Sequence, residues 1–194
     1  MTFTAKQRAA IESWIGTADS IEDSFFRSVE RRYMDPDDVL SGEGTVASGG
    51  RFAAVGVRAV YLSTTDTGAS KETTARKSRL GSAAQISTAK YPRIVFAITT
   101  KLQRVLRLDD LGASGPGGDV RKVCLEENDL TASVDLAMQL EEAGIQGLIF
   151  PSVVSGGDDN LIVYLSNCVT GALQIQNEDE FIKEAKKIVS RRES

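Results

Sequence analysis

The stretch EEAGIQGLIFPSVVSGGDDNLIVYL, residues 141–165, decides the fold class of this chain. Its first residues end a helix predicted over 131–143, which a glycine terminates. The apolar run at 147–151 predicts a buried strand, and a turn of Ser, Gly, Asp and Asn residues follows it. Residues 161–165 are then the hairpin partner of that strand. A helix that leads into an antiparallel hairpin favours an α+β fold.

Further elements are predicted on both sides of this hairpin. Thr4 and Gln7 form a capping box for a helix over 5–15, and Asp66 caps a helix that continues to about Arg79. The other predicted strands are 24–29, 58–63, 93–99 and 104–108. The expected connectors and loops are 19–24, 34–50, 81–90 and 112–119. A last helix begins at Asn177. Because strands and helices do not alternate regularly, we expect one compact α+β domain with mixed or antiparallel sheets and flanking helices.

Composition and charge exclude several classes of protein. The 194 residues fit one domain, and 41% hydrophobic and 26% charged residues are typical of a globular protein. A net charge of −4 argues against binding nucleic acid through broad electrostatics. No apolar run is long enough to span a bilayer, so a membrane is not an expected partner. The charged, amphipathic N-terminal stretch does not resemble a signal peptide, and we expect a cytoplasmic protein.

The chain contains no histidine, which restricts its chemistry more than any other count. Ser-His and Cys-His nucleophiles and histidine-ligated metal sites are excluded, so no metal is expected. Cys124 and Cys168 have neither metal-type nor redox-type spacing, and both are expected to be buried free thiols. Any catalysis must therefore come from carboxylates, Ser, Tyr, Lys or Arg.

The segment around residues 49–63 holds the first candidate site residues. Gly49 and Gly50 allow the backbone to approach a ligand closely, and Arg51 can bind a phosphate or carboxylate through its planar guanidinium. The alternative is a tight turn with a surface arginine. Strand alternation places Tyr61 and Ser63 on one face, where Tyr61 either lines a polar cleft or simply covers the sheet.

Three more residues are candidates with equally ordinary alternatives. Glu72 lies in the helix that Asp66 begins, where it faces a site or pairs with Arg76 four residues later. Arg27 stands beside core aromatic residues in a strand and needs either solvent or a partner. Ser152 ends the apolar strand GLIFP; it caps a turn or binds a ligand, since no base is present to make it a nucleophile.

In their order along the chain these segments resemble the RES domain family, named for its Arg, Glu and Ser residues. The matching segments are FFRSVERRYMDP, LSGEG, SGGRF with Gly56, AVYLS, ASKE, RIVFAI with RVLRL, and EEAGIQGLIFPSVVSGGDDNLIVY. They cover roughly residues 24–166, with eleven positions from Tyr61 to Glu72. We therefore expect an N-terminal helical segment over 1–20 and a RES domain over 21–194, with its core at 24–166 and a C-terminal helix at about 178–192.

The resemblance also implies a function. RES proteins are mostly toxins of bacterial toxin–antitoxin modules; their characterised members resemble ADP-ribosyltransferases in fold and cleave the nicotinamide–ribose bond of NAD. By this likeness Glu72, Arg51 and Tyr61 are catalytic, and Arg27, Ser152 and Gly50 bind the substrate. NAD is then a substrate and no cofactor is expected; water or phosphate is the acceptor, a cognate antitoxin is a partner, and a homo-oligomer is considered.

Two departures from the family pattern affect these expectations. Residues 53–55 are Ala-Ala-Val where many family members have Asn-Pro, and Ser28 stands where some members have a tyrosine. Two alternative functions stay open. One is ADP-ribosyl transfer to a protein target, which uses the same chemistry. The other, suggested by the changes after Arg51, is an inactive nucleotide-binding or antitoxin-interacting module.

Overall fold

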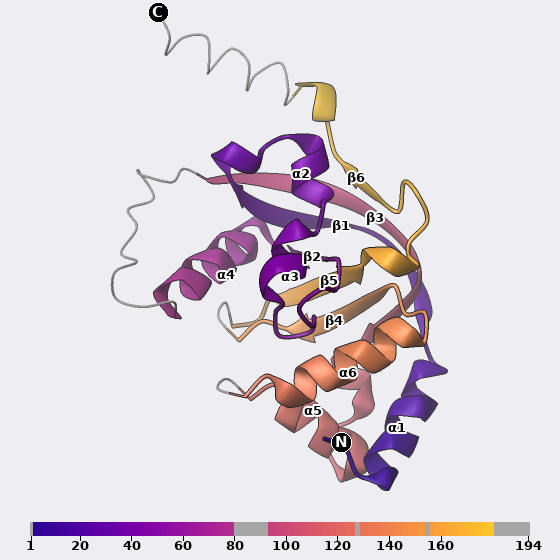
Figure 1. Cartoon of the computed structure of the whole chain (residues 1–194). Helices are drawn as coiled ribbons and strands as arrows, with labels where there is room; N and C mark the ends of the chain where they lie inside the picture. Colours follow the sequence, from indigo (N-terminus) through magenta and orange to yellow (C-terminus); the bar gives the residue numbers. More distant parts are fainter. Residues whose placement is uncertain (1, 80–92, 127–128, 154–155, 181–194) are drawn as a thin grey trace, which may run out of the picture.

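The strands of the computed structural model form one sheet that folds back on itself (Figure 1). The structure describes residues 2–79, 93–126, 129–153 and 156–180, except for the side chains of 73–79. The strands are β1 (Asp19–Glu30), β2 (Ala59–Ser63), β3 (Arg93–Arg107), β4 (Gly147–Pro151), β5 (Asp159–Tyr164) and β6 (Leu173–Ile175). Their order is β1-β2-β5-β4-β3-β6, and β1 also pairs with β3. Among the pairings of these described strands, only β3–β4 is parallel. The predicted α+β domain with a mixed sheet is confirmed.

The helices gather at the end and sides of this sheet. They are α1 (Ala5–Ile15), α2 (Pro36–Leu40), α3 (Glu43–Ser48), α4 (Asp66–Arg79), α5 (Gly115–Cys124) and α6 (Thr131–Glu142), with 3-10 turns η1 (Arg31–Tyr33), η3 (Leu108–Leu111) and η4 (Leu165–Asn167). Figure 1 shows α1, α5 and α6 together at one end of the molecule, and α4 at one side of the strands. Within the described residues, no helix is both long and apolar enough to cross a membrane.

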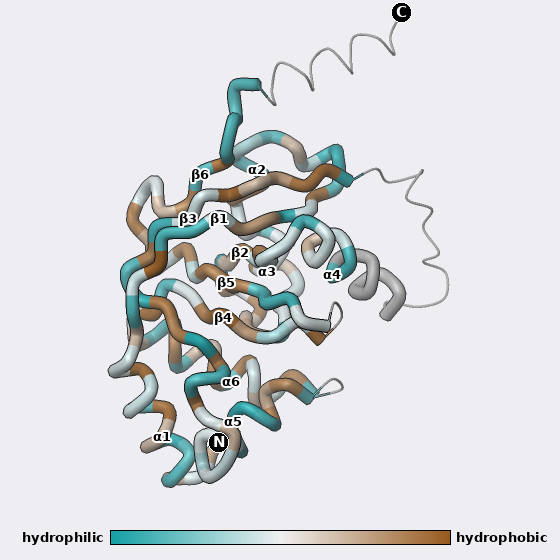
Figure 2. The backbone as a smooth tube through the Cα atoms, turned by 180° about the vertical axis from the view of Figure 1, so that it is seen from behind, coloured by the Kyte–Doolittle hydropathy of each residue, from teal (hydrophilic) through white to brown (hydrophobic). Residues whose placement is uncertain are grey.

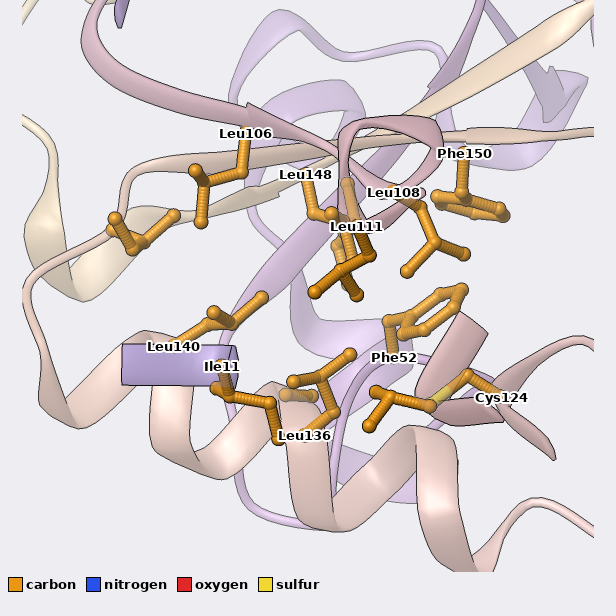
Figure 3. Packing of buried hydrophobic residues seen from close by; sticks show 14 of the residues in the cluster. Ile11, Phe52, Leu106, Leu108, Leu111, Cys124, Leu136, Leu140, Leu148 and Phe150 are labelled. Atoms are coloured by element: carbon orange, nitrogen blue, oxygen red, sulfur yellow. The ribbon is translucent and has the colours of Figure 1, made fainter. Parts of the chain in front are cut away.

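Two apolar cores stabilise the domain, one on each face of the central strands β2, β4 and β5. The first core joins α1, α5 and α6 to the sheet, and Figure 3 shows Leu136 and Leu140 of α6 facing Leu148 of β4. The second core lies beneath the long β1–β3 pair, where Phe25 and Leu102 are buried. Figure 2 shows the resulting hydrophobic colouring along β4 and β5 in the middle of the molecule. Burial of both faces explains why these strands read as continuous apolar runs.

The N-terminal helix and the central hairpin follow the sequence closely. Thr4 and Gln7 form the predicted capping box, and α1 covers the predicted residues. The β4–β5 hairpin is antiparallel as predicted, although β5 begins at Asp159, two residues before the predicted start at Leu161. The predicted loop at 81–90 lies outside the described residues, as does most of the predicted last helix.

Other predicted boundaries were wrong. Residues 19–24, expected to be a connector, are the first half of β1, and the two strands predicted between 93 and 108 are one strand. Segment 34–50 contains α2 and α3, and segment 112–119 contains the start of α5. In α2 and α5 a proline stands in the first turn, where its missing N–H needs no partner.

Burial makes both thiols poor nucleophiles, although Cys168 is only half-buried. It raises the pKa of Cys124 to about 12 and that of Cys168 to about 11. At pH 8 the thiolate fractions are then roughly 10⁻⁴ and 10⁻³, so we expect iodoacetamide to modify Cys124 about 2,000-fold and Cys168 about 200-fold more slowly than a free cysteine. Intact-mass analysis checks this, with urea-unfolded protein as the control. Rapid labelling of the native protein would contradict the burial of these thiols.

Candidate functional site

Tyr61 lies at the centre of the predicted site, on the middle residue of β2. Its backbone oxygen accepts a hydrogen bond of 2.9 Å from Arg27 Nη1, and its hydroxyl accepts one of 3.2 Å from the Phe52 N–H. The ring meets that of Phe150 edge to face at a centroid distance of 6.5 Å. The half-buried ring is therefore fixed at its edge and at its hydroxyl, and its direction is set before any ligand binds.

Arg27 is placed where β1 and β2 meet. These two strands share a single residue pair, Phe26 with Ser63, so the Arg27 side chain reaches from one strand to the other. Its Nε is buried without a hydrogen-bond partner, and no carboxylate among the described residues forms an ion pair with it. Burial first, and the charge of Arg93 second, lower the pKa of Arg27 to about 10. The alternative of an exposed arginine is wrong, because Arg27 is half-buried and its Nε is fully buried, and no carboxylate among the described residues compensates its charge.

Glu72 is held by two donors from the β4–β5 hairpin. Ser152 Oγ and Asn160 Nδ2 both donate to the same oxygen, Oε1, at 2.5 and 2.7 Å. Both donor residues are buried, at 8% and 7% exposed. Across the part of the chain that the structure describes, no hydrogen bond or ion pair involves Glu72 Oε2. The carboxylate is therefore anchored through one oxygen and offers the other.

Asn160 was missed in the sequence, because we assigned it to the turn before the second hairpin strand. It pairs with Ser63 of β2 on one side and with Phe150 of β4 on the other. The signal was present: an asparagine directly before the apolar run LIVY is a polar residue at a position that strands usually fill with apolar ones.

Helix α4 approaches β2 closely enough to bring Glu72 to these donors. A methyl group added to Gly68 would collide with Ser63 Oγ and would come within 3.0 Å of Asp158 Oδ2. Glycine at this place lets the first turns of α4 pack directly on the end of β2. The alternative pairing of Glu72 with Arg76 involves a side chain outside the described residues.

Arg51 does not project freely into solvent. Its Nη1 donates to the backbone oxygens of Cys124 and Glu126 at 3.0 and 2.7 Å, just beyond α5. A cation at this place compensates the partial negative charge of a helix C-terminus. The sequence alternative was a tight turn with a surface arginine. The turn is confirmed at Gly49, whose φ is +60°, but Arg51 is not a free surface residue.

A family comparison adds to this geometry. The RES domain model matches residues 24–180, which is most of the chain. The chain belongs to the RES domain family. The match spans all of the candidate residues named above.

Solved structures show the same fold as this RES domain. The crystal structure of the M. tuberculosis MbcT-MbcA toxin–antitoxin complex contains a similar chain, with a TM-score of 0.69 and 18% sequence identity. The similarity covers 90% of this chain and 91% of that one. The comparison with curated proteins gave no match.

Hydrogen bonds join predicted residues at two places in the described part of this RES domain. Arg27 contacts Tyr61, and Ser152 contacts Glu72. The paired strands β2 and β5 join these contacts, because Ser63 stands opposite Asn160. A separate cavity of about 730 Å³, between α1, the start of β1 and η3, is lined by none of these residues. The candidate site therefore rests on the chemistry of its side chains and not on the volume of that cavity.

Gly50 gives a test of how tightly Tyr61 is held. A methyl group added there would collide with the Tyr61 hydroxyl and lie 3.0 Å from Cζ of the same ring. We expect Gly50→Ala to move the ring off the Phe52 N–H and to lower substrate turnover about 10-fold or more. Gly44→Ala is the matched control, since its added methyl would contact nothing within 4 Å. Equal turnover in the two variants would show that the position of the Tyr61 ring does not matter for activity and that Tyr61 is not part of the site.

Proposed function

We propose that this RES domain is the toxin of a toxin–antitoxin pair and that it consumes NAD by cleaving the bond between nicotinamide and ribose. The observation that carries the proposal is the anchored carboxylate of Glu72, whose Oε1 accepts from Ser152 and Asn160. Membership of the RES family and the fold shared with the MbcT-MbcA complex support the toxin assignment.

The Glu72 carboxylate can stabilise the positive charge that develops on the ribose during the reaction. The C1′–N1 bond breaks, its electron pair leaves with nicotinamide, and the ribose becomes an oxocarbenium-like cation. Glu72 Oε2 stabilises this cation and accepts a hydrogen bond from a ribose hydroxyl. Water or phosphate then forms the new bond to C1′, and the water proton passes to solvent or to the carboxylate.

Arg27 supplies the positive charge that the pyrophosphate needs. A guanidinium binds phosphate oxygens in pairs, and its hydrogen bonds are stronger where water is excluded. Arg27 is half-buried with its Nε fully buried, and no carboxylate among the described residues pairs with it, so a phosphate group would compensate its charge. Tyr61 gives a ring face and a hydroxyl beside it, and Arg51 joins the glycine turn to the end of α5.

Product analysis tests this proposal and separates it from its alternatives. Purified protein is incubated with NAD, with and without phosphate, and the products are identified by mass spectrometry. We expect nicotinamide with free ADP-ribose, or with its 1″-phosphate when phosphate is present. A labelled protein in a cell extract would instead indicate ADP-ribosyl transfer. Intact NAD under all conditions would refute the proposal and favour an inactive binding module.

A further inference from the structure

We infer that Asn160 is a positioning residue, which with Ser152 fixes Glu72 Oε1 so that Oε2 faces the substrate. This inference rests on the proposed function for its chemistry, but its geometry is independent of that function. Asn160 Nδ2 lies 2.7 Å from Oε1, and Ser152 Oγ lies 2.5 Å from the same atom.

The backbone of Asn160 is rigidly placed. It lies in β5 between β2 and β4, opposite Ser63 and Phe150 respectively. A residue paired on both sides cannot shift without disturbing two strands, so its amide is a fixed donor. Strand positions disfavour asparagine, and burial of an amide costs free energy unless it is hydrogen-bonded. The Glu72 carboxylate satisfies this amide.

The two oxygens of the Glu72 carboxylate have different surroundings, because both donors bond to Oε1. Hydrogen bonds to a charged acceptor are short and strong, so Oε1 is held in place. Rotation of the carboxylate would break both bonds at once. Oε2, which has no partner among the described residues, then keeps one direction relative to β2 and Tyr61.

Asn160 also serves to attach α4 to the hairpin, and a purely structural role has to be distinguished from positioning. Gln146 provides the matched control, because it is a buried amide too, 8% exposed, that bonds the backbone of Gln103 and Asn167. Its contacts join β3 to η4 and touch none of the site residues. Loss of either amide should lower stability, but only loss of Asn160 should affect the chemistry.

The first test compares turnover of NAD. We expect Asn160→Ala to lower kcat about 100-fold with KM changed less than about 3-fold, since the carboxylate is misplaced while the binding residues remain. Gln146→Ala should keep kcat within about 2-fold of the wild type. In a Glu72→Gln background, Asn160→Ala should cause no further loss, because residues that act through one group are not additive. Wild-type kcat in Asn160→Ala, or additive losses, would overturn the inference.

The second test uses Asn160→Asp, which replaces the donor by a carboxylate of the same shape. At neutral pH two carboxylates would face each other and repel, so kcat should fall more than in Asn160→Ala. When the introduced carboxyl group is protonated it can donate to Oε1 again, so the kcat of this variant relative to wild type should rise as the pH is lowered. For Asn160→Ala, the kcat relative to wild type should not change with pH. If this relative kcat changed with pH in the same way for both variants, the positioning role would be contradicted.

A third measurement keeps the inference testable if the proposed function fails. Should the wild type leave NAD intact, that function is refuted, and a crystal structure of Asn160→Ala decides the geometry alone. We expect Glu72 to adopt another side-chain rotamer and Ser152 Oγ to lose its contact with Oε1. An unchanged carboxylate would show that Ser152 alone holds it and would overturn the inference.

Discussion

Glu72→Gln should lower the rate of nicotinamide release about 1,000-fold while the protein stays folded. Glutamine keeps an oxygen that can accept from Ser152 and Asn160, so both anchoring hydrogen bonds can persist. What is lost is the negative charge beside the ribose, and removal of one electrostatic contact to a transition state typically costs roughly 10²–10³-fold or about 3–4 kcal/mol. The unfolding free energy should change by less than about 1 kcal/mol.

Nicotinamide release measured by chromatography checks this result. Glu43→Gln is the matched control, because Glu43 lies on the surface in an ion pair with Arg58 and its change should leave the rate unchanged. We also expect Glu72→Gln to be expressed in cells at a higher level than the wild type, since a toxin limits its own production. A Glu72→Gln protein that kept most of the wild-type rate would remove Glu72 from the mechanism.

Arg27→Met should weaken NAD binding about 100-fold without a loss of stability. Methionine fills most of the volume of the arginine stem but carries no charge. The unliganded protein then no longer has to hold a half-buried cation that no carboxylate among the described residues compensates, and this gain offsets the lost hydrogen bond to the Tyr61 oxygen. With the guanidinium gone, the pyrophosphate loses a contact of the strong, charge-assisted kind.

Thermal unfolding with and without NAD separates binding from folding. In Glu72→Gln, which should bind NAD without cleaving it, saturating NAD should raise Tm because NAD binds only the folded state. When Arg27→Met is added to this variant, the Tm without ligand should be equal or higher, and NAD should not raise it. Arg104→Met serves as the control, since Arg104 Nη1 also donates to a backbone oxygen, that of Ala143, but away from the site. A large drop in Tm with NAD binding retained would assign Arg27 to the fold alone.

The elements that depend on local patterns could be predicted from the sequence. The capping box of α1, the burial of β4 and the hairpin to β5 follow from side chains within a few residues of each other. The wrong boundaries depended on distant partners. Residues 19–24 are polar and show no alternation, yet they form a strand because β3 pairs with them, as in the ion pair between Glu22 and Lys101.

Glycine content misled the prediction for α5. The segment 112–119 reads as a loop, but a helix begins at Gly115 and packs closely on η3. A methyl group on Gly117 would collide with the Leu111 backbone oxygen, so the glycine permits contact and does not break the helix. Such a close approach is a property of the packed molecule and has no local signature.

The candidate site could be predicted only in part. Sequence reasoning supplied the residue types and, through the RES resemblance, their order, but not which atoms meet. Nothing in the local pattern indicated that Arg51 holds the end of α5 or that Asn160 shares Glu72 with Ser152. The expected likeness to ADP-ribosyltransferases and the domain boundary at residue 20 remain predictions.

A crystal structure of Glu72→Gln with NAD would show whether NAD binds between Arg27, Tyr61 and Glu72. The variant should bind NAD without cleaving it. We expect the pyrophosphate on the Arg27 guanidinium, the nicotinamide ring beside Tyr61, and C1′ of the nicotinamide ribose within about 4 Å of the residue 72 side chain. NAD bound elsewhere, for example in the cavity beside α1, or its absence at saturating concentration, would contradict the account.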